Sequence, residues 1–380
     1  MTATPARRAR AANDELVLAE LRRSGALSRA ELGRRTGLPK TTLFSTVAAL
    51  LDSGVLLERE AVDNGSRSRG RPASQVVLNP AAGLYAGLDI GRARMRAVIV
   101  NASHEVVASG ACGVPSCVRA DVVVPAAVDL IRSAGAEAGI SLAALAGLGA
   151  GFAGVPGVEI DAEEIEQVRR ELNDVFDAPV ALGNNSRAAA LAEATWGAGR
   201  AVEDLVYVRW STGIGGGFVV GGLAVAGAHG GAGEIGHVSV DPAGKRCHCG
   251  GRGCLEGFAG GAALLEQCVR RGLEVDGLDG LVAAAQNLSP VVMEVVGAAA
   301  RRLGGVLAGT VAQLDPSRIV VGGELAQLGS LILDPVRQAV AQLALPLARR
   351  RVEVVQADLG VNAAALGAVA LLLRQGTVSD

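Results

Sequence analysis

The sequence predicts an α/β chain in which a small winged helix-turn-helix domain precedes a body of two α/β lobes. The first 80 residues contain short amphipathic helices followed by a basic segment. The rest of the chain repeats one order of elements twice: a strand, a glycine-rich turn and two further strands. Half of the residues are apolar but only 2% are aromatic, a composition typical of an α/β protein rich in alanine, valine, leucine and glycine. The length of 380 residues allows two or three domains with ample cores.

Charge is divided unevenly between the two ends of the chain. Residues 1–80 carry 13 Lys and Arg against 8 Asp and Glu, whereas the remainder carries 23 against 30. A basic head on an acidic body predicts that only the head binds a polyanion. We expect residues 1–12 to form a flexible basic tail and residues 13–80 to form the DNA-binding domain. The sequence shows neither an apolar secretory segment nor a run of about 18 uncharged apolar residues, so a soluble, cytoplasmic protein without a membrane partner is expected.

The N-terminal domain follows the order helix, helix, turn, helix. Residues 14–23 place leucines at helical spacing. Ser28 and Glu31 have the spacing of a capping box that opens a second helix, and Gly37 ends it. Pro39 then begins a third helix, whose N-terminal side chains should meet base edges in the major groove of DNA. The residues expected to do so are Lys40, Thr41, Thr42 and Ser45.

A β-wing is expected directly after these helices. Val55–Glu58 and Gln75–Leu78 are strand-like segments, and residues 66–72 between them form a basic stretch next to a proline. An isolated run of this kind is typical of a solvated linker. After a helix-turn-helix pattern, however, it indicates a cationic wing tip that enters a minor groove. The expected wing contacts to DNA are Arg67, Arg69 and Arg71.

The body is divided at the start of the second copy of its repeated pattern. The first copy begins with the strand at 84–91, and the second with the strand at 205–210 and a turn at 211–217. We therefore place the first lobe at 81–200 and the second at 201–380. A helix expected at about 363–374 can pack back on the first lobe.

The two glycine-rich turns have a shared interpretation. Asp89-Ile-Gly91 ends the first strand, and the run Thr212-Gly213-Ile-Gly215 follows its counterpart in the second copy. Backbone N–H groups of such turns can surround phosphates, and an aspartate can orient a hydrated Mg²⁺. Each turn alone is also typical of an ordinary β-turn. The two turns occupy equivalent positions in the two copies of the repeated pattern, which favours a cleft between the lobes that bound phosphate in an ancestral protein.

A metal site is predicted within residues 237–254. Cys247, Cys249 and Cys254 offer three thiolates, and the nearby His237 offers an imidazole. This is the donor set of a tetrahedral structural Zn²⁺ site, although His248 is also within reach as a ligand. A disulfide arrangement is the alternative, but a reducing compartment favours metal. Glu234 and Glu256 flank the cluster and are expected to serve a ligand beside the metal. The three other cysteines lie in apolar surroundings typical of core packing: Cys112, Cys117 and Cys268.

With these motifs in place, the sequence resembles the ROK family (repressors, open reading frames, kinases), in its regulator branch with an N-terminal winged helix. The resemblance runs from about residue 13 to the end, and residues 211–256 are its most specific part. The family's signature C-x-C-G-x-x-G-C-x-E is complete at 247–256. The resemblance implies an actin-like, sugar-kinase (ribonuclease H-like) fold for the two lobes. It also implies a Zn²⁺ ion held by His237, Cys247, Cys249 and Cys254.

The same resemblance implies a sugar site. Glu234, His237 and Glu256 would contact sugar hydroxyls, with Asn184 opposite them and Asn185 beside it. Carboxylates and amides suit this task because they offer paired hydrogen-bonding groups to neighbouring hydroxyls. A histidine that binds zinc through one ring nitrogen keeps the other for a ligand.

The sequence departs from the family's kinases at two positions. Kinases of the family have Asp where Asn185 stands, and an amide cannot act as the base that takes the proton from the attacking sugar hydroxyl. Arg92 follows Gly91 where kinases continue with small residues, so its side chain is expected to fill the nucleotide site. ATP and Mg²⁺ are therefore not expected as cofactors. The residues interpreted as remnants of a nucleotide site are Asp89, Gly91, Thr212, Gly213, Gly215, Gly322 and Gly323.

The sequence thus predicts a sugar-responsive transcriptional regulator of carbohydrate metabolism, acting as a repressor. Its partners would be double-stranded operator DNA and a sugar or sugar-phosphate effector. A palindromic operator and a homodimer or homotetramer follow because two-fold protein symmetry matches two half-sites. The alternative is an ATP-dependent hexose or N-acylamino-sugar kinase with a regulatory head, and a third hypothesis is a DNA-binding protein that has lost ligand sensing.

Overall fold

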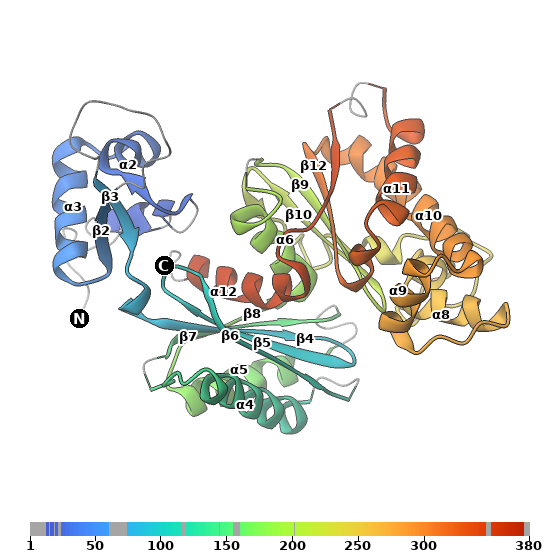
Figure 1. The fold of residues 1–380 in the computed structure, drawn as a ribbon, viewed down its shortest axis with the longest axis horizontal. Coiled ribbons are helices and arrows are strands. Elements are labelled where there is room, and N and C mark those ends of the chain that lie inside the picture. Colours follow the sequence, from blue (N-terminus) through green and yellow to red (C-terminus); the bar gives the residue numbers. More distant parts are fainter. Residues whose placement is uncertain are drawn as a thin grey trace.

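The computed structural model describes residues 13–14, 16–18, 20–21, 24–60, 74–115, 119–143, 145–154, 160–200, 202–346 and 351–375. They form a small winged helix attached to two α/β lobes (Figure 1). The α/β fold class predicted from the sequence is confirmed. The expected basic tail 1–12, the wing arginines Arg67, Arg69 and Arg71, and Cys117 lie outside the described residues.

The winged helix has the local signals that the sequence predicts. The side chain of Ser28 accepts a hydrogen bond from the Glu31 amide at the start of α2 (Arg29–Thr36), and the Glu31 carboxylate accepts one from the Ser28 backbone N–H. Gly37 ends this helix in the left-handed conformation, with φ 69°, which glycine adopts without strain. Pro39 precedes α3 (Lys40–Asp52), the expected recognition helix. Three strands complete the domain in the order β1-β3-β2: β1 (Leu27–Ser28), β2 (Leu56–Glu60) and β3 (Ser74–Leu78).

The first lobe is a five-stranded sheet in the order β6-β5-β4-β7-β8. Helices α4 (Ala120–Glu137) and α5 (Ala162–Phe176) cover one face, and α12 (Ala363–Gln375) lies on the other (Figure 1). The C-terminal helix therefore packs on the first lobe. The strands are β4 (Leu84–Ile90), β5 (Arg94–Asn101), β6 (Val106–Gly113), β7 (Leu145–Phe152) and β8 (Val180–Asn184).

The second lobe repeats this arrangement with a sheet in the order β11-β10-β9-β12-β13. Alternation along β9 (Leu205–Trp210) sends Val206 and Val208 into a core with α10 (Pro290–Leu314), and Tyr207 into a core with α6 (Asn185–Trp196). The other strands are β10 (Ile214–Val220), β11 (Leu223–Ala224), β12 (Arg318–Gly322) and β13 (Glu353–Gln356). The other helices are α7 (Glu256–Ala259), α8 (Gly261–Arg270), α9 (Gly277–Gln286) and α11 (Ser330–Leu343).

The turn predicted at 211–217 is wrong in its second half, because β10 already begins at Ile214. The glycines that suggested a turn lie within the strand. A Cβ atom on Gly217 would stand 2.6 Å from the Ala190 Cβ, and one on Gly215 would overlap Ser186, both on α6. Glycine is therefore needed at these positions because α6 approaches the strand closely. The sequence around the glycines does not reveal this approach.

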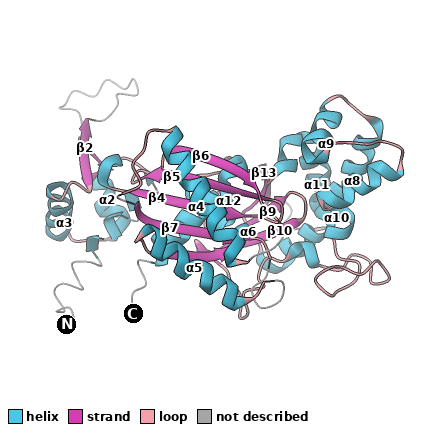
Figure 2. Ribbon diagram, turned by 90° about the horizontal axis from the view of Figure 1, so that it is seen from below, coloured by secondary structure: helices cyan, strands magenta, loops and turns pink. Residues whose placement is uncertain are grey.

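Two helices join the lobes. Helix α6 follows the first sheet in sequence but packs on β9 and β10 of the second, while α12 packs on β4, β7 and β8 of the first. The two helices contact each other between the sheets, and Figure 2 shows them side by side. A Cβ on Gly367 of α12 would overlap the carbonyl oxygen of Ala188 on α6, so backbone meets backbone at this point.

The path from the winged helix to the cleft is short. Strand β3 is followed by the turn η1 (Pro80–Ala82) and then by β4, and the turn after β4, from Gly91 to Ala93, lines the cleft between the lobes. The Asn79 side chain donates a hydrogen bond to the Gly54 carbonyl, and the Ser103 hydroxyl donates one to the Leu78 carbonyl. The first bond fastens the end of β3 within the winged helix, and the second connects it to the first lobe.

Among the described residues, no single helix is both long enough and apolar enough to span a membrane. Helices α9 and α10 reach that length and apolarity only when taken together, across a bend of 107°.

Candidate functional site

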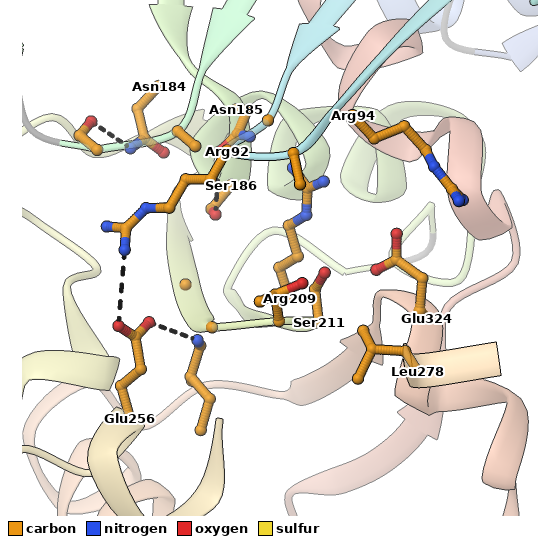
Figure 3. A pocket seen from close by; sticks show the side chains of 18 of the residues that line it. Arg92, Arg94, Asn184, Asn185, Ser186, Arg209, Ser211, Glu256, Leu278 and Glu324 are labelled. Atoms are coloured by element: carbon orange, nitrogen blue, oxygen red, sulfur yellow. Dashed lines mark hydrogen bonds and ion pairs between the residues drawn. The ribbon is translucent and has the colours of Figure 1, made fainter. Parts of the chain in front are cut away.

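A cavity of about 470 Å³ lies between the two lobes (Figure 3). Its walls come from the β4–β5 turn and the start of α6 on one side, and from the β9–β10 turn and the metal-ligand segment on the other. All five residues predicted to bind a sugar line it: Asn184, Asn185, Glu234, His237 and Glu256.

Glu256 lines the cavity and has contacts to both lobes. One of its carboxylate oxygens accepts a hydrogen bond of 2.8 Å from the Ile214 backbone N–H, which belongs to the second glycine-rich segment. Its other oxygen lies 4.0 Å from the Arg92 guanidinium of the first lobe (Figure 3). Arg92 also lies within 2.9 Å of the His248 ring nitrogen. Arg92 therefore bridges the cleft and connects the first lobe to the metal-ligand segment.

Asp89, the residue interpreted as a remnant Mg²⁺-orienting group, is buried and already paired. The Arg209 guanidinium of β9 donates to both carboxylate oxygens, at 3.0 and 2.8 Å. The Asn185 amide donates a third hydrogen bond, at 2.8 Å. Burial opposes the charging of Arg209, but Asp89 more than offsets this and raises the pKa of the guanidinium above its usual value. Protein groups thus satisfy the carboxylate interpreted as a remnant of a Mg²⁺ site.

Asn184 also has structural partners. Its side-chain oxygen accepts the Arg187 amide as the N-cap of α6, at 3.0 Å, and its amide nitrogen donates to the Gly154 carbonyl at 3.2 Å. Arg187 is largely buried, which lowers the pKa of its guanidinium, although Glu234 partly opposes this. The first-lobe wall of the cavity is thus organised by the same cap that begins α6.

The other predicted nucleotide-site residues divide into two groups. Gly91, Thr212, Gly213 and Gly215 line the cavity, whereas Gly322 and Gly323 are not among its lining residues but directly precede Glu324, which is. Glu324 is 3.8 Å from the Arg96 guanidinium of β5. Together with Asp89–Arg209 and Arg92–Glu256, this gives three ion pairs between the lobes along the cleft.

The predicted metal ligands converge beside the cavity. One donor atom from each of His237, Cys247, Cys249 and Cys254 lies within 4.8 Å of the others. The Cys249 and Cys254 sulfurs are 3.7 Å apart, and the Cys247 sulfur is 3.6 Å from Nδ1 of His237. Zn–S bonds of about 2.3 Å at tetrahedral angles require sulfurs about 3.8 Å apart. The four side chains therefore fit one tetrahedral metal ion.

The ionisation of the thiols is consistent with this fit. Burial, with contributions from the Cys249 and Cys247 thiols, raises the pKa of Cys254 to about 12. Thiols this close together resist ionisation because their thiolates would repel one another, and a cation between them would remove that repulsion. The thiolate is also the form that binds a metal ion. Among the histidines near the cluster, His248 also lies 3.7 Å from the Cys247 sulfur, but the compact four-donor group contains His237.

His237 connects the metal ligands to the cavity. Its Nδ1 faces Cys247, and its Nε2 lies 4.0 Å from a Glu234 carboxylate oxygen on the cavity wall. The two ring nitrogens thus face different neighbours, as expected for a residue that serves both a metal and a ligand.

The predicted DNA-contacting side chains lie along the recognition helix. Lys40, Thr41 and Ser45 are exposed, and Thr42 is half-buried, with its carbonyl accepting the Ser45 hydroxyl. The helix places these short polar groups at its N-terminal end, while Leu43 and Val47 enter the core of the winged helix.

A model of the ROK family matches residues 85–375. The chain belongs to the ROK family. The putative xylose repressor of Caldicellulosiruptor sp. (strain Rt8B.4) is 27% identical over 382 residues, which cover 95% of both chains.

Two solved ROK structures are similar to the chain. One is a ROK family transcriptional regulator described as a homolog of the E. coli MLC protein; it superposes with a TM-score of 0.77 and 24% identity, covering 97% of this chain and 99% of its own. The other is a ROK family glucokinase from Streptomyces griseus in complex with glucose and AMPPNP, with a TM-score of 0.68 and 30% identity over 77% of this chain and 100% of its own. The first match includes the winged helix as well as the ROK lobes.

The sequence-based interpretation missed several cavity residues of this ROK protein. Arg209 is the main one, and its only signal is a charge within an otherwise apolar strand, Leu205–Trp210. Leu278 and the two carboxylates Asp276 and Asp279 also line the cavity, from a segment without a motif, and Ser186 lines it next to the predicted Asn184 and Asn185.

Proposed function

We propose that this protein is a sugar-responsive transcriptional repressor of carbohydrate metabolism that acts in the cytoplasm. The winged helix binds double-stranded operator DNA, and a sugar or sugar phosphate binds in the cavity between the lobes. The observation that carries the proposal is the position of Glu234, His237 and Glu256 on one wall of that cavity, in a chain that also has a recognition helix. The repressor relative, aligned over almost the whole chain, supports the same reading.

The effector would act by changing how the lobes are held together. Glu256 is a proposed sugar ligand and also the partner of Arg92 across the cleft. A sugar that binds Glu256 therefore competes with Arg92 for the same carboxylate. The effector needs a differential affinity for two lobe arrangements of about 1–3 kcal/mol to switch DNA binding. Two winged helices in a homodimer or homotetramer would read a palindromic operator.

A structural Zn²⁺ ion is proposed for the Cys₃His cluster. Cys247, Cys249 and Cys254 would bind it as thiolates and His237 through Nδ1, which leaves Nε2 for the sugar. The distances that match a tetrahedron support this donor set. Zinc would hold His237 and the start of α7, and therefore Glu256, in position for the effector.

The deciding experiment uses the purified protein and its own upstream DNA. Operator affinity is measured with and without each member of a broad sugar and sugar-phosphate panel, and thermal shifts are recorded in parallel. We expect sequence-specific binding that one sugar class weakens. A panel that changes neither operator affinity nor thermal stability would contradict effector control.

Sugar kinase activity is the second candidate, because the glucokinase from Streptomyces griseus matches the two lobes. With ATP, Mg²⁺ and mixed sugars, we expect no ADP release at the ordinary kinase rate of about 1–100 per second. Asn185 cannot act as the base, and Arg209 already occupies the Asp89 carboxylate. Release of ADP at that rate would overturn the proposal.

Asn185→Asp is not expected to restore sugar phosphorylation by itself. It would place a second carboxylate at the position of an amide that donates to Asp89, 2.8 Å away. Two carboxylates this close cannot both ionise readily. The same ADP assay on this variant checks the expectation, and efficient turnover would show that the base is the only missing part.

Arg71→Ala is expected to weaken operator binding several-fold and to lower the slope of log Kd against log salt by about 1, as for the loss of one phosphate contact. The reason is the predicted position of the basic wing in a minor groove. Titrations across a salt series measure both quantities. Arg301→Ala, at an exposed arginine of α10, is the matched control and should leave them unchanged. An Arg71→Ala protein with the wild-type salt slope would remove the wing from the DNA contacts.

A further inference from the structure

An exposed aromatic side chain lies on the recognition helix. Phe44 of α3 is 41% exposed, and no other phenylalanine, tyrosine or tryptophan in the described part of the chain is as exposed. The others are buried, as Trp210 and Tyr207 are, or half-buried. A ring left in solvent forgoes the free energy of burial, and this ring lies on the expected recognition helix.

Phe44 shares its face of the helix with predicted DNA contacts. Lys40, Thr41 and Ser45 are exposed beside it, whereas Leu43 and Val47 are buried in the domain core. Phe44 is one turn after Lys40, in the N-terminal half of the helix. Side chains in this half of a recognition helix reach base edges when the helix enters the major groove.

Two cations flank the ring. The Arg29 guanidinium carbon lies 5.2 Å from the ring centroid, and the Lys40 ammonium lies 5.9 Å from it. Both are within the range of cation–π attraction, which restricts the ring without covering it. Arg29 is itself held by Glu58 of the wing strand β2, at 2.6 Å. The Phe44 ring is therefore an apolar surface bordered by the positive charges of Arg29 and Lys40. Such a surface is complementary to an apolar group that lies beside the phosphates of a nucleic acid.

We propose that Phe44 is a specificity-determining residue that contacts the 5-methyl group of a thymine in the operator. The methyl group is the apolar feature that distinguishes thymine in the major groove, and phenylalanine is among the side chains that contact it. Lys40 and Arg29 would meet the adjacent phosphates and set the register of the ring. This inference rests on the proposed DNA-binding function, and it adds an A·T preference to the polar contacts of the helix.

The test begins with selection of duplexes from a randomised library by the full-length wild-type protein. Each thymine of the selected duplex is then replaced in turn by deoxyuridine, which removes the methyl group and keeps every hydrogen-bonding group. We expect one thymine per half-site whose replacement weakens binding about fourfold, the value for one buried methyl group. Phe44→Ala should bind the thymine and deoxyuridine duplexes equally, with an affinity below that of the wild type. Leu16→Ala is the matched control, because Leu16 is an apolar residue of the same domain with 46% exposure, and it should keep the wild-type discrimination.

Thermal unfolding of both variants verifies that the domain is intact, which the exposure of both residues favours. If Phe44→Ala discriminates between thymine and deoxyuridine as strongly as the wild type, or if no thymine methyl affects wild-type binding, the inference is overturned while DNA binding stands. If the wild type enriches no duplex, the DNA-binding proposal itself fails and the inference falls with it.

Discussion

Removal of the metal from the Cys₃His cluster is expected to abolish the response to the sugar effector and to lower the thermal unfolding temperature. His237 has one ring nitrogen toward Cys247 and the other near Glu234 on the cavity wall. The cluster also holds the segment that leads into Glu256, which caps the Ile214 amide. Without the ion, three thiols and two proposed sugar ligands lose their common anchor. Loss of a structural zinc site commonly costs a large part of the folding free energy of its segment.

The measurement combines metal analysis, thermal unfolding and effector response before and after treatment with a chelator. Cys254→Ser gives the same test without a chelator, since it removes a buried ligand. Cys268→Ser is the matched control, because Cys268 is also buried but packs in the core of the second lobe. It should lose stability without losing bound metal. A chelated protein that remains folded and still responds to the sugar would separate the two roles assigned to His237.

Arg209→Met is expected to lower the free energy of unfolding by about 3–5 kcal/mol, the usual cost of breaking a buried ion pair on one side. The Asp89 side chain is only 2% exposed, and Arg209 supplies two of its three hydrogen bonds. Methionine keeps the apolar stem of the side chain but leaves the buried carboxylate with one of its three hydrogen bonds, the one from Asn185. Chemical denaturation at neutral pH measures the change.

Two controls show whether the burial of the pair causes this effect. Arg169→Met breaks an exposed ion pair with Glu166 on α5 and should cost less than about 1 kcal/mol. The double variant Asp89→Asn with Arg209→Met removes both buried charges and should recover much of the lost stability. If Arg209→Met costs no more than Arg169→Met, the pair does not hold the lobes as inferred.

Local signals explain what could be predicted from the sequence. The capping box at Ser28, the stop at Gly37 and the strand at 205–210 each depend on neighbours within a few residues, and the structure confirms them. The metal ligands could also be predicted, because three of them lie within eight residues of one another in the sequence.

Long-range contacts explain what could not be predicted. Arg209 and Asp89 are 120 residues apart, and neither position shows a pattern that pairs it with the other. The glycines of β10 suggested a turn because their reason, the approach of α6, lies in another element. The cation-flanked ring of Phe44 depends on Arg29 from a different helix.

The contact of Gly367 with Ala188 has a mechanical consequence for the two lobes. Backbone meets backbone there, and the side chains that pack around this point are mainly alanines, such as Ala189 and Ala192 of α6 and Ala364 and Ala365 of α12. A rotation of one lobe against the other would therefore pivot at this crossing of small residues. The ion pairs Arg92–Glu256 and Arg96–Glu324 join the lobes along the cleft. A ligand that rearranges these few charges would change the angle between the lobes, and β4 would transmit that change to the winged helix that precedes it.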